Sequence, residues 1–165
     1  MIDRYQPHVL VLPEDDANRQ IANGFKLNLE FKKSNSLRIL PPAGGWVKVV
    51  EAFNNDQVND VQKYGERRII LLIDFDNHFP ERLDYIKSRI PDGISERVFV
   101  LGALSDPQEL KTRMARKGLE EIGKSLAQDC SENTQRIWGY EMLRHNRSEL
   151  DRLILSVKPI LFTVN

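Results

Sequence analysis

The stretch RRIILLIDFDNHFP, residues 67–80, decides the fold of this chain. Five consecutive apolar residues, 69–73, run directly into two carboxylates, Asp74 and Asp76. A short and continuous apolar run is typical of a strand that is buried on both faces, as in a parallel sheet. Because side chains alternate along a strand, we expect the two carboxylates to share one face while Phe75, between them, points to the other.

Three further apolar runs of the same kind recur at 8–13, 37–42 and 97–102. Together with residues 67–76 they predict four strands. A helical pattern follows each strand, as in residues 15–29, where apolar residues stand at four-residue steps. The order βαβαβαβα predicts an α/β fold with a four-stranded, mainly parallel Rossmann-like sheet flanked by helices and connected by right-handed crossovers.

The remainder of the chain, residues 117–165, reads as helical and predicts a C-terminal extension of the α/β core. No repeat, low-complexity segment or linker divides the sequence, so residues 1–165 are expected to form a single domain. The polar stretch 54–67 has few large apolar residues and is the best candidate for a mobile segment.

The composition narrows the classes of function. Lys and Arg total 24 and so do Asp and Glu, so the net charge of zero gives no general attraction to nucleic acid or acidic membranes. The one cysteine, Cys130, excludes an internal disulfide and a thiolate zinc cluster. The N-terminal stretch has no signal-peptide pattern, and no apolar run reaches membrane-spanning length. We expect a cytoplasmic protein without a membrane partner.

Acidic residues follow two of the predicted strands. Glu14, Asp15 and Asp16 stand after the first strand, and Asp74 and Asp76 after the third. In the common strand order 2-1-3-4 the carboxyl ends of these strands are neighbours, at the point where ligands bind in open parallel sheets. Carboxylates that meet there repel one another unless a cation intervenes, and oxygen ligands suit Mg²⁺ or Mn²⁺. All five acids are therefore candidate metal ligands, although some could instead cap helix N-termini.

The acid after the first strand in VLVLPEDD and the Asp-x-Asp in LLIDFDN resemble the Toprim domain, over about residues 7–115. That domain is the magnesium-dependent module of topoisomerases, primases and nucleases of the overcoming-lysogenization-defect class. The resemblance implies that Glu14 is a metal ligand or a catalytic general acid/base, and that Asp74 and Asp76 bind metal. The chain departs from the family in having Glu-Asp where Glu-Gly is usual, and Asn18 where the related nucleases often have an acid.

Two further sites are candidates for binding phosphate or substrate. Gly44 and Gly45 stand between a strand and a helix whose first turn contains Lys48, so their N–H groups could hold a phosphate. A tight turn that needs glycine is the alternative. Ser105 and Glu109 lie at another carboxyl edge of the sheet, where a capping box is the competing explanation.

These features predict a Mg²⁺-dependent, nuclease-like enzyme that cleaves phosphodiesters in nucleic acid. A local basic stretch could contact the nucleic-acid backbone: Lys111, Arg113, Arg116 and Lys117. The alternative is a non-catalytic interaction or regulatory module that works with a partner such as a separately encoded ATPase, because related Toprim nucleases are commonly joined to an ATPase domain. A third hypothesis is a small-molecule phosphatase of the α/β class or a phosphotransfer receiver, with Asp15 and Asp16 as the acidic pair and Asp74 as phosphoacceptor. The lack of clear Thr/Ser and Lys residues after the later strands argues against the receiver, although Ser105 keeps it open.

Overall fold

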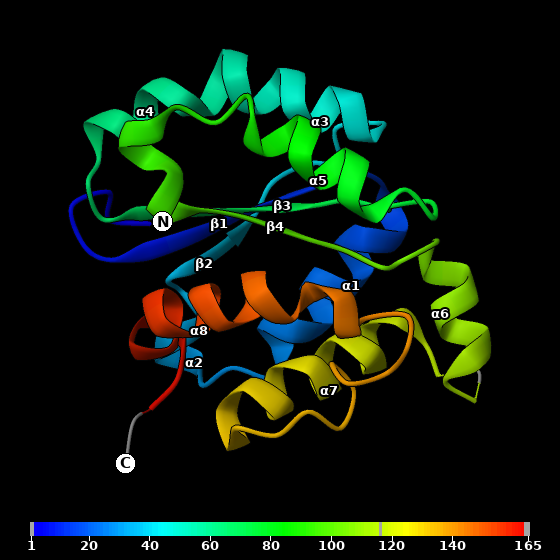
Figure 1. Cartoon of the computed structure of the whole chain (residues 1–165). Coiled ribbons are helices and arrows are strands. Elements are labelled where there is room, and N and C mark those ends of the chain that lie inside the picture. The colour runs from blue at the N-terminus through cyan, green and yellow to red at the C-terminus, as the bar shows by residue number, and fades with distance from the viewer. Residues whose placement is uncertain (1, 116, 164–165) are drawn as a thin grey trace.

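The computed structural model describes residues 2–115 and 117–163 and shows a four-stranded parallel sheet with helices on both faces (Figure 1). The strands are β1 (His8–Pro13), β2 (Leu37–Ile39), β3 (Arg67–Leu72) and β4 (Val98–Leu101). Their order across the sheet is β2-β1-β3-β4, and every neighbouring pair is parallel. The predicted α/β fold is confirmed, although the second and third strands end earlier than expected.

Most residues of the strands are apolar because each face of the sheet packs against a layer of helices. Alternate residues enter two separate buried clusters. One cluster contains Leu10, Leu12, Ile69, Leu71, Val98 and Val100. The other contains Val9, Val11, Ile70, Phe99 and Leu101. Burying a side chain of this kind stabilises the fold by roughly 1.5–3 kcal/mol, so the two clusters hold the sheet in place.

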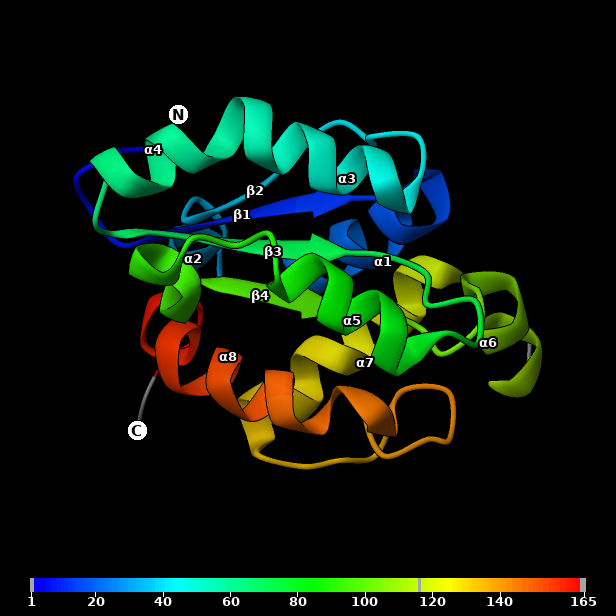
Figure 2. The same ribbon diagram turned by 45° about the horizontal axis from the view of Figure 1, so that its top comes forward.

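The helices form two layers, which Figures 1 and 2 show on opposite sides of the sheet. One layer contains α1 (Asp16–Leu27), α2 (Phe31–Ser34), α7 (Leu119–Glu132) and α8 (Arg147–Leu161). The other contains α3 (Trp46–Ala52), a π-helical turn (Phe53–Gln57), α4 (Val58–Lys63) and α5 (Phe79–Lys87). The helix α6 (Pro107–Arg113) lies beyond the carboxyl ends of the strands, and 3₁₀ turns occur at Asp92–Arg97 and Arg144–Asn146. None of the helices in the described residues combines the length and apolar character needed to cross a membrane.

The polar stretch 54–67 is largely helical, because it contains most of the π-helical turn and the whole of α4. Two buried apolar side chains anchor it to the rest of the domain, Val61 at 0% exposure and Tyr64 at 6%. Several of the polar residues that suggested mobility are exposed to solvent, among them Asn54, Asn55 and Gln62.

A glycine on each helix allows α1 and α7 to pack closely. A Cβ atom at Gly24 would overlap the backbone of Glu120, and one at Gly123 would overlap the backbone of Ile21. The missing side chains let the two helix backbones approach each other. The helical extension predicted for residues 117–165 is therefore joined to the α/β core through a tight helix contact.

Side chains at the N-terminal end of α8 occupy the outer edge of β4 in place of a fifth strand. The Glu149 carboxylate accepts the Val100 N–H at 3.0 Å. The Asn146 side chain pairs with both backbone groups of Gly102, accepting its N–H at 3.1 Å and donating to its carbonyl at 2.9 Å. Because an unpaired strand edge is a template for pairing with another chain, these contacts protect the β4 edge of the sheet.

Candidate functional site

Glu14 and Asp74 meet at the carboxyl ends of β1 and β3. Glu14 directly follows β1, and Asp74 lies two residues beyond β3. The Glu14 Oε2 atom accepts a hydrogen bond from the Asp74 backbone N–H at 2.6 Å. Both side chains are half-buried. The structure thus brings together two of the acids that were expected to converge.

Asn18 connects Asp74 to the first helix. Its side chain is buried, with 1% of the residue exposed, and its Nδ2 donates to Asp74 Oδ1 at 2.9 Å and to Asp15 Oδ1 at 3.0 Å. Asp15 is also the N-cap of α1, where it accepts the Asn18 N–H at 2.9 Å. Asn18 therefore positions both acids. This role was not predicted from the sequence, although Asn18 stands three residues after the cap residue Asp15, where it could have been expected to contact the cap.

The two acids share an environment that disfavours negative charge. Burial raises the pKa of Asp74 to about 7, against the opposing hydrogen bond from Asn18, and the charges of Glu14, Asp15 and Asp106 raise it further. Burial also raises the pKa of Glu14 above its ordinary value, against the hydrogen bond from the Asp74 N–H. Ionising both groups therefore requires a positive partner.

Asp76 does not join this pair. Its φ is 48° and that of Asn77 is 61°, so the chain turns immediately after Phe75 and the expected alternation of side chains ends there. The Asp76 side chain is 69% exposed and lies 3.6 Å from Arg82 Nη2. The Asp-x-Asp pattern does not predict a left-handed backbone at this position.

Arg82 provides positive charge at the edge of the site and was missed in the sequence. Its Nη1 donates to the Asp74 backbone carbonyl at 2.7 Å, and its guanidinium lies 4.8 Å from the centroid of the Trp46 ring. Its position near the start of α5, shortly after the Asp-x-Asp motif, could have indicated that it lies close to the acids. Arg82 fixes the backbone of Asp74 and leaves that residue's carboxylate uncompensated.

Asp16 points away from the Glu14–Asp74 pair. It forms an ion pair with Arg19 and accepts a hydrogen bond from Gln20 at 2.7 Å, and its side chain is 61% exposed. Among the described residues, no group of three or more His, Cys, Asp or Glu side chains is arranged to hold a metal ion. The carboxylates that converge are therefore a pair, accompanied by Asp15 through its shared bond to Asn18.

Gly44 and Gly45 use their N–H groups inside the protein. Both donate to the Glu14 backbone carbonyl, at 2.8 and 3.2 Å, and their φ angles of 97° and 150° are ones that glycine adopts most readily. The glycine turn therefore holds the backbone of Glu14 rather than offering these two donors to a phosphate. The Lys48 side chain is exposed beside Gly44.

Ser105 and Glu109 form a capping arrangement at α6. Asp106 accepts the Glu109 N–H at 2.9 Å as the N-cap. The Ser105 hydroxyl donates to the Glu109 carboxylate, which also lies 3.2 Å from Arg113. The carboxylate of Glu109 is therefore engaged by Ser105 and Arg113.

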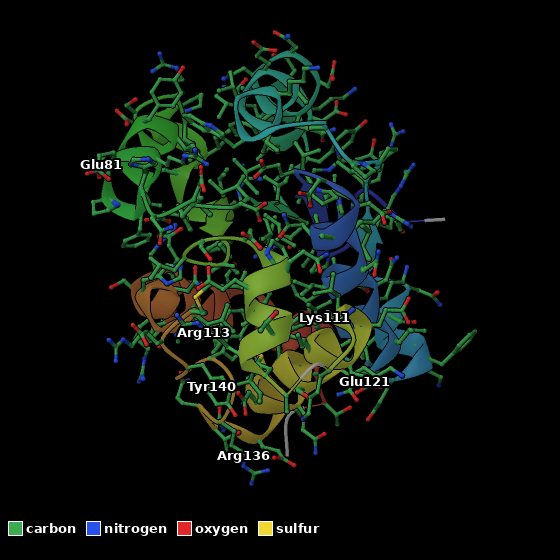
Figure 3. The ribbon with its side chains drawn as sticks, turned by 90° about the vertical axis from the view of Figure 1, so that its right-hand side faces the viewer. Glu81, Lys111, Arg113, Glu121, Arg136 and Tyr140 are labelled. Carbon is green, nitrogen blue, oxygen red and sulfur yellow. The ribbon has the colours of Figure 1, made fainter. Side chains whose placement is uncertain are left out.

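The predicted basic stretch lies on and after α6. Figure 3 views the carboxyl edge of the sheet and shows Lys111 and Arg113 projecting from this helix. Arg113 pairs with two acids, at 3.2 Å from Glu109 and 3.6 Å from Glu141. Arg116 lies outside the described residues, so the structure places only part of the stretch.

The pH dependence of stability tests the raised pKa of Asp74. A carboxyl group with a raised pKa in the folded state stabilises the protein while it is protonated. Its contribution is fully present below the ordinary pKa of 3.8 and is lost as the pH rises through about 7. In EDTA, we expect the melting temperature of the wild type to fall relative to that of Asp74→Asn over this range. The exposed Asp16→Asn is the control, and a pH profile of Asp74→Asn identical to that of the wild type would contradict the raised pKa.

Comparisons with known proteins identified no relative of this chain. No protein-family model, no curated protein and no solved structure matches the chain. The resemblance to the Toprim domain therefore stays a prediction that rests on the motifs around Glu14 and Asp74.

Proposed function

We propose that this protein is a Mg²⁺-dependent phosphodiesterase of the Toprim type that cleaves nucleic acid, with Glu14 and Asp74 as the residues that hold the ion. The observation that supports the proposal is the hydrogen bond of 2.6 Å from the Asp74 backbone N–H to Glu14 Oε2. It holds the two half-buried residues side by side. They lie between β1 and β3, where the order of the sheet reverses and where parallel sheets bind ligands. A divalent cation would stabilise both carboxylates in their ionised forms.

The pair fits Mg²⁺ rather than a metal that needs a complete protein cage. Mg²⁺ commonly uses one or two carboxylates, keeps several of its waters and completes its coordination with substrate phosphate. Bound Mg²⁺ would neutralise charge on the phosphate and lower the pKa of water at the site. The absence of a three-residue cluster in the described parts of the chain is compatible with this mode of binding.

The protein residues have distinct roles in this proposal. Asn18 orients Asp74 by donating to its Oδ1 atom, and the Oδ2 atom would bind the ion. Glu14 would hold the ion and accept a proton, because it directly follows β1 at the edge of the sheet where the substrate phosphate would bind. Arg82 contributes positive charge for the phosphate at the edge of the site.

A non-catalytic module is the second candidate, and one observation favours it. Nucleases that use two metal ions need more ligands than one carboxylate pair supplies, and no cluster of three metal-binding side chains occurs in the described residues. In this alternative, Glu14 and Asp74 bind a regulatory ion or a basic partner, and a separately encoded ATPase provides the activity.

Cleavage assays distinguish the two candidates. Purified protein is incubated with single-stranded DNA, double-stranded DNA and RNA in Mg²⁺ or Mn²⁺, with EDTA as the control. We expect cleavage of at least one substrate that EDTA abolishes. Cleavage that persists in EDTA would contradict the metal-dependent mechanism, and inactivity with every substrate and both metals would favour the non-catalytic module.

A further inference from the structure

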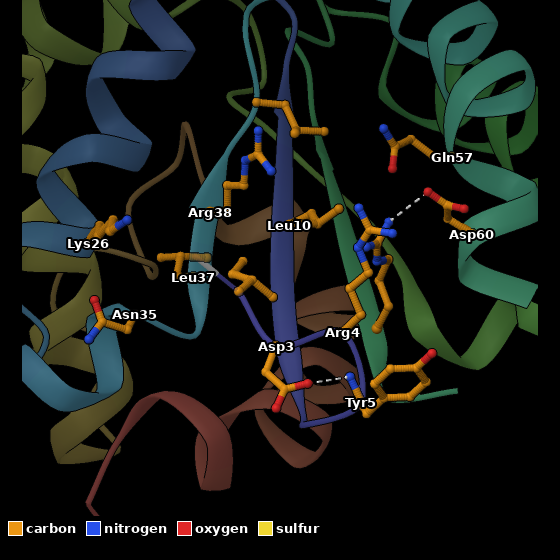
Figure 4. Close-up of a pocket in the computed structure, with 13 residues that line it drawn as sticks. Asp3, Arg4, Tyr5, Leu10, Lys26, Asn35, Leu37, Arg38, Gln57 and Asp60 are labelled. Atoms are coloured by element: carbon orange, nitrogen blue, oxygen red, sulfur yellow. Dashed lines mark hydrogen bonds and ion pairs between the residues drawn. The ribbon is translucent and has the colours of Figure 1, made fainter. Parts of the chain in front are cut away.

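We propose that the chain has a second ligand site, a cationic cavity that binds a nucleoside phosphate. The cavity has a volume of about 710 Å³ and lies between α4, the edge strand β2 and the segment before β1 (Figure 4). Ligand pockets for small molecules commonly measure roughly 300–1,000 Å³. Neither Glu14 nor Asp74 lines it, so this site is separate from the proposed metal centre.

The cavity carries an excess of positive charge. Four cationic side chains and two acidic ones line it: Arg4, Lys26, Arg38 and Arg67 against Asp3 and Asp60. Asp60 is paired with Arg67, and Asp3 accepts the Tyr5 backbone N–H at 3.0 Å. Within residues 2–115 and 117–163, no ion pair occupies the other three cations. An anion is therefore the ligand that this lining favours.

Arg67 is a rigid, buried element of this lining. The residue is 7% exposed, and its Nε donates to His8 Nε2 at 3.0 Å. Since that ring nitrogen accepts, His8 Nδ1 carries the proton and donates to the Gln6 carbonyl at 2.7 Å. The carboxylate of Asp60 is 3.4 Å from Arg67 Nη1, which is long for a charged pair. A guanidinium fixed in this way is preorganised for a second anionic partner.

The charge of Arg67 is also poorly compensated by its surroundings. Burial and the neighbouring charge of Arg4 lower the pKa of the Arg67 guanidinium, against the opposing charge of Asp60. Both guanidinium groups lie beside the ring of Tyr64, at 5.5 Å for Arg4 and 5.3 Å for Arg67. Two guanidinium groups on one side of a hollow suit phosphate, because the N–H groups that are not bonded to His8, Asp60 or Tyr64 can donate to its oxygens.

Two further groups indicate that the anion is attached to a nucleoside. Gln57 lines the cavity, and its Oε1 atom is buried without a hydrogen-bond partner in the described residues, so an N–H donor that reaches this atom would satisfy it. Gln57 ends the π-helical turn, a distortion that often occurs at functional sites. The Tyr5 ring is 77% exposed at the rim and offers a face for base stacking.

Figure 4 shows how these groups surround one space. Arg38 comes from β2 on one side, and Gln57 and Asp60 come from the opposite helical wall. Tyr5 comes from the segment before β1. A phosphate beside the arginines would satisfy the cations, and the attached base would extend toward Tyr5 at one end of this space or toward Gln57 at the other.

Calorimetric titration in EDTA tests this site without involving the metal centre. The probes are AMP, GMP, CMP and UMP, with inorganic phosphate and adenosine as partial ligands, at low ionic strength. We expect saturable binding of at least one nucleotide, about tenfold or more tighter than either partial ligand. Arg38→Gln should weaken that binding about tenfold. Gln57→Leu should weaken it severalfold, and the exposed control Arg136→Gln should leave it unchanged.

Three results would overturn the proposal. They are the absence of saturable binding of all four nucleotides at roughly millimolar concentration, equal affinity for inorganic phosphate and nucleotide, and unchanged nucleotide affinity in Arg38→Gln. Melting curves establish that each variant is folded, and Arg38 is an exposed side chain whose replacement does not disturb the core. Because EDTA removes divalent ions, failure here is distinguishable from failure of the Glu14–Asp74 metal site.

Discussion

Replacing Glu149 by alanine is expected to lower the free energy of unfolding by about 3 kcal/mol. The residue is 3% exposed, and its carboxylate accepts the Val100 N–H and pairs with Lys87. Alanine leaves a buried N–H on the edge of β4 without an acceptor, which by itself costs about 1–3 kcal/mol. It also removes the partner of the Lys87 ammonium and opens an edge that can pair with another chain.

Urea denaturation of Glu149→Ala and of Asp151→Ala measures this effect. Asp151 lies on the same helix, but its carboxylate is 58% exposed and pairs with Arg147 on the surface. Such surface pairs contribute about 0–1 kcal/mol, so the control should retain nearly wild-type stability. A loss in Glu149→Ala no larger than that of the control would contradict the role of Glu149 at the sheet edge.

Glu14→Gln is expected to reduce metal-dependent cleavage of nucleic acid by a factor of about 10² or more. The amide keeps the size of the side chain and one oxygen acceptor for the Asp74 N–H, so the fold should be preserved. It removes the negative charge that holds the ion and the base that takes the proton. Asp16→Asn is the matched control, because Asp16 is exposed and points away from the pair.

Initial rates under saturating Mg²⁺ or Mn²⁺ measure this change, and melting curves verify folding. We expect loss of activity in Glu14→Gln and near-wild-type activity in Asp16→Asn. Equal losses in the two variants would indicate a general charge effect, and full activity of Glu14→Gln would remove Glu14 from the mechanism.

Much of the fold could be predicted because its determinants are local. Continuous apolar runs such as 69–73 specify buried parallel strands, and the helical patterns between them specify the crossovers. The strand order β2-β1-β3-β4 then brings the ends of β1 and β3 together. The meeting of Glu14 and Asp74 follows from this order, which is why it could be anticipated.

The fine structure of the acidic site depends on backbone and side-chain details that the motifs do not encode. The left-handed backbone of Asp76 directs its carboxylate to Arg82 instead of to Asp74. Asn18, which looked like the loss of an acid, is a buried donor between two acids. In the first case a backbone angle, and in the second a side-chain hydrogen bond, determines which residues can bind the same ligand.

The cavity and the closed sheet edge could not be predicted, because both depend on contacts between distant parts of the chain. Arg67 and His8 are 59 positions apart, and Val100 and Glu149 are 49 positions apart. No periodicity or short motif links these pairs. Only the packed fold shows that Arg67 is fixed in a cavity and that Glu149 completes β4.

A crystal structure of the protein soaked in Mn²⁺, with anomalous scattering to locate the ion, tests the central claim most directly. We predict an ion bound by carboxylate oxygens of both Glu14 and Asp74, at distances of about 2.0–2.3 Å. The same soak of Asp74→Asn should show much weaker occupancy. A wild-type structure with no anomalous peak between these two carboxylates, or with Mn²⁺ bound only at Asp16 or Asp76, would contradict the account.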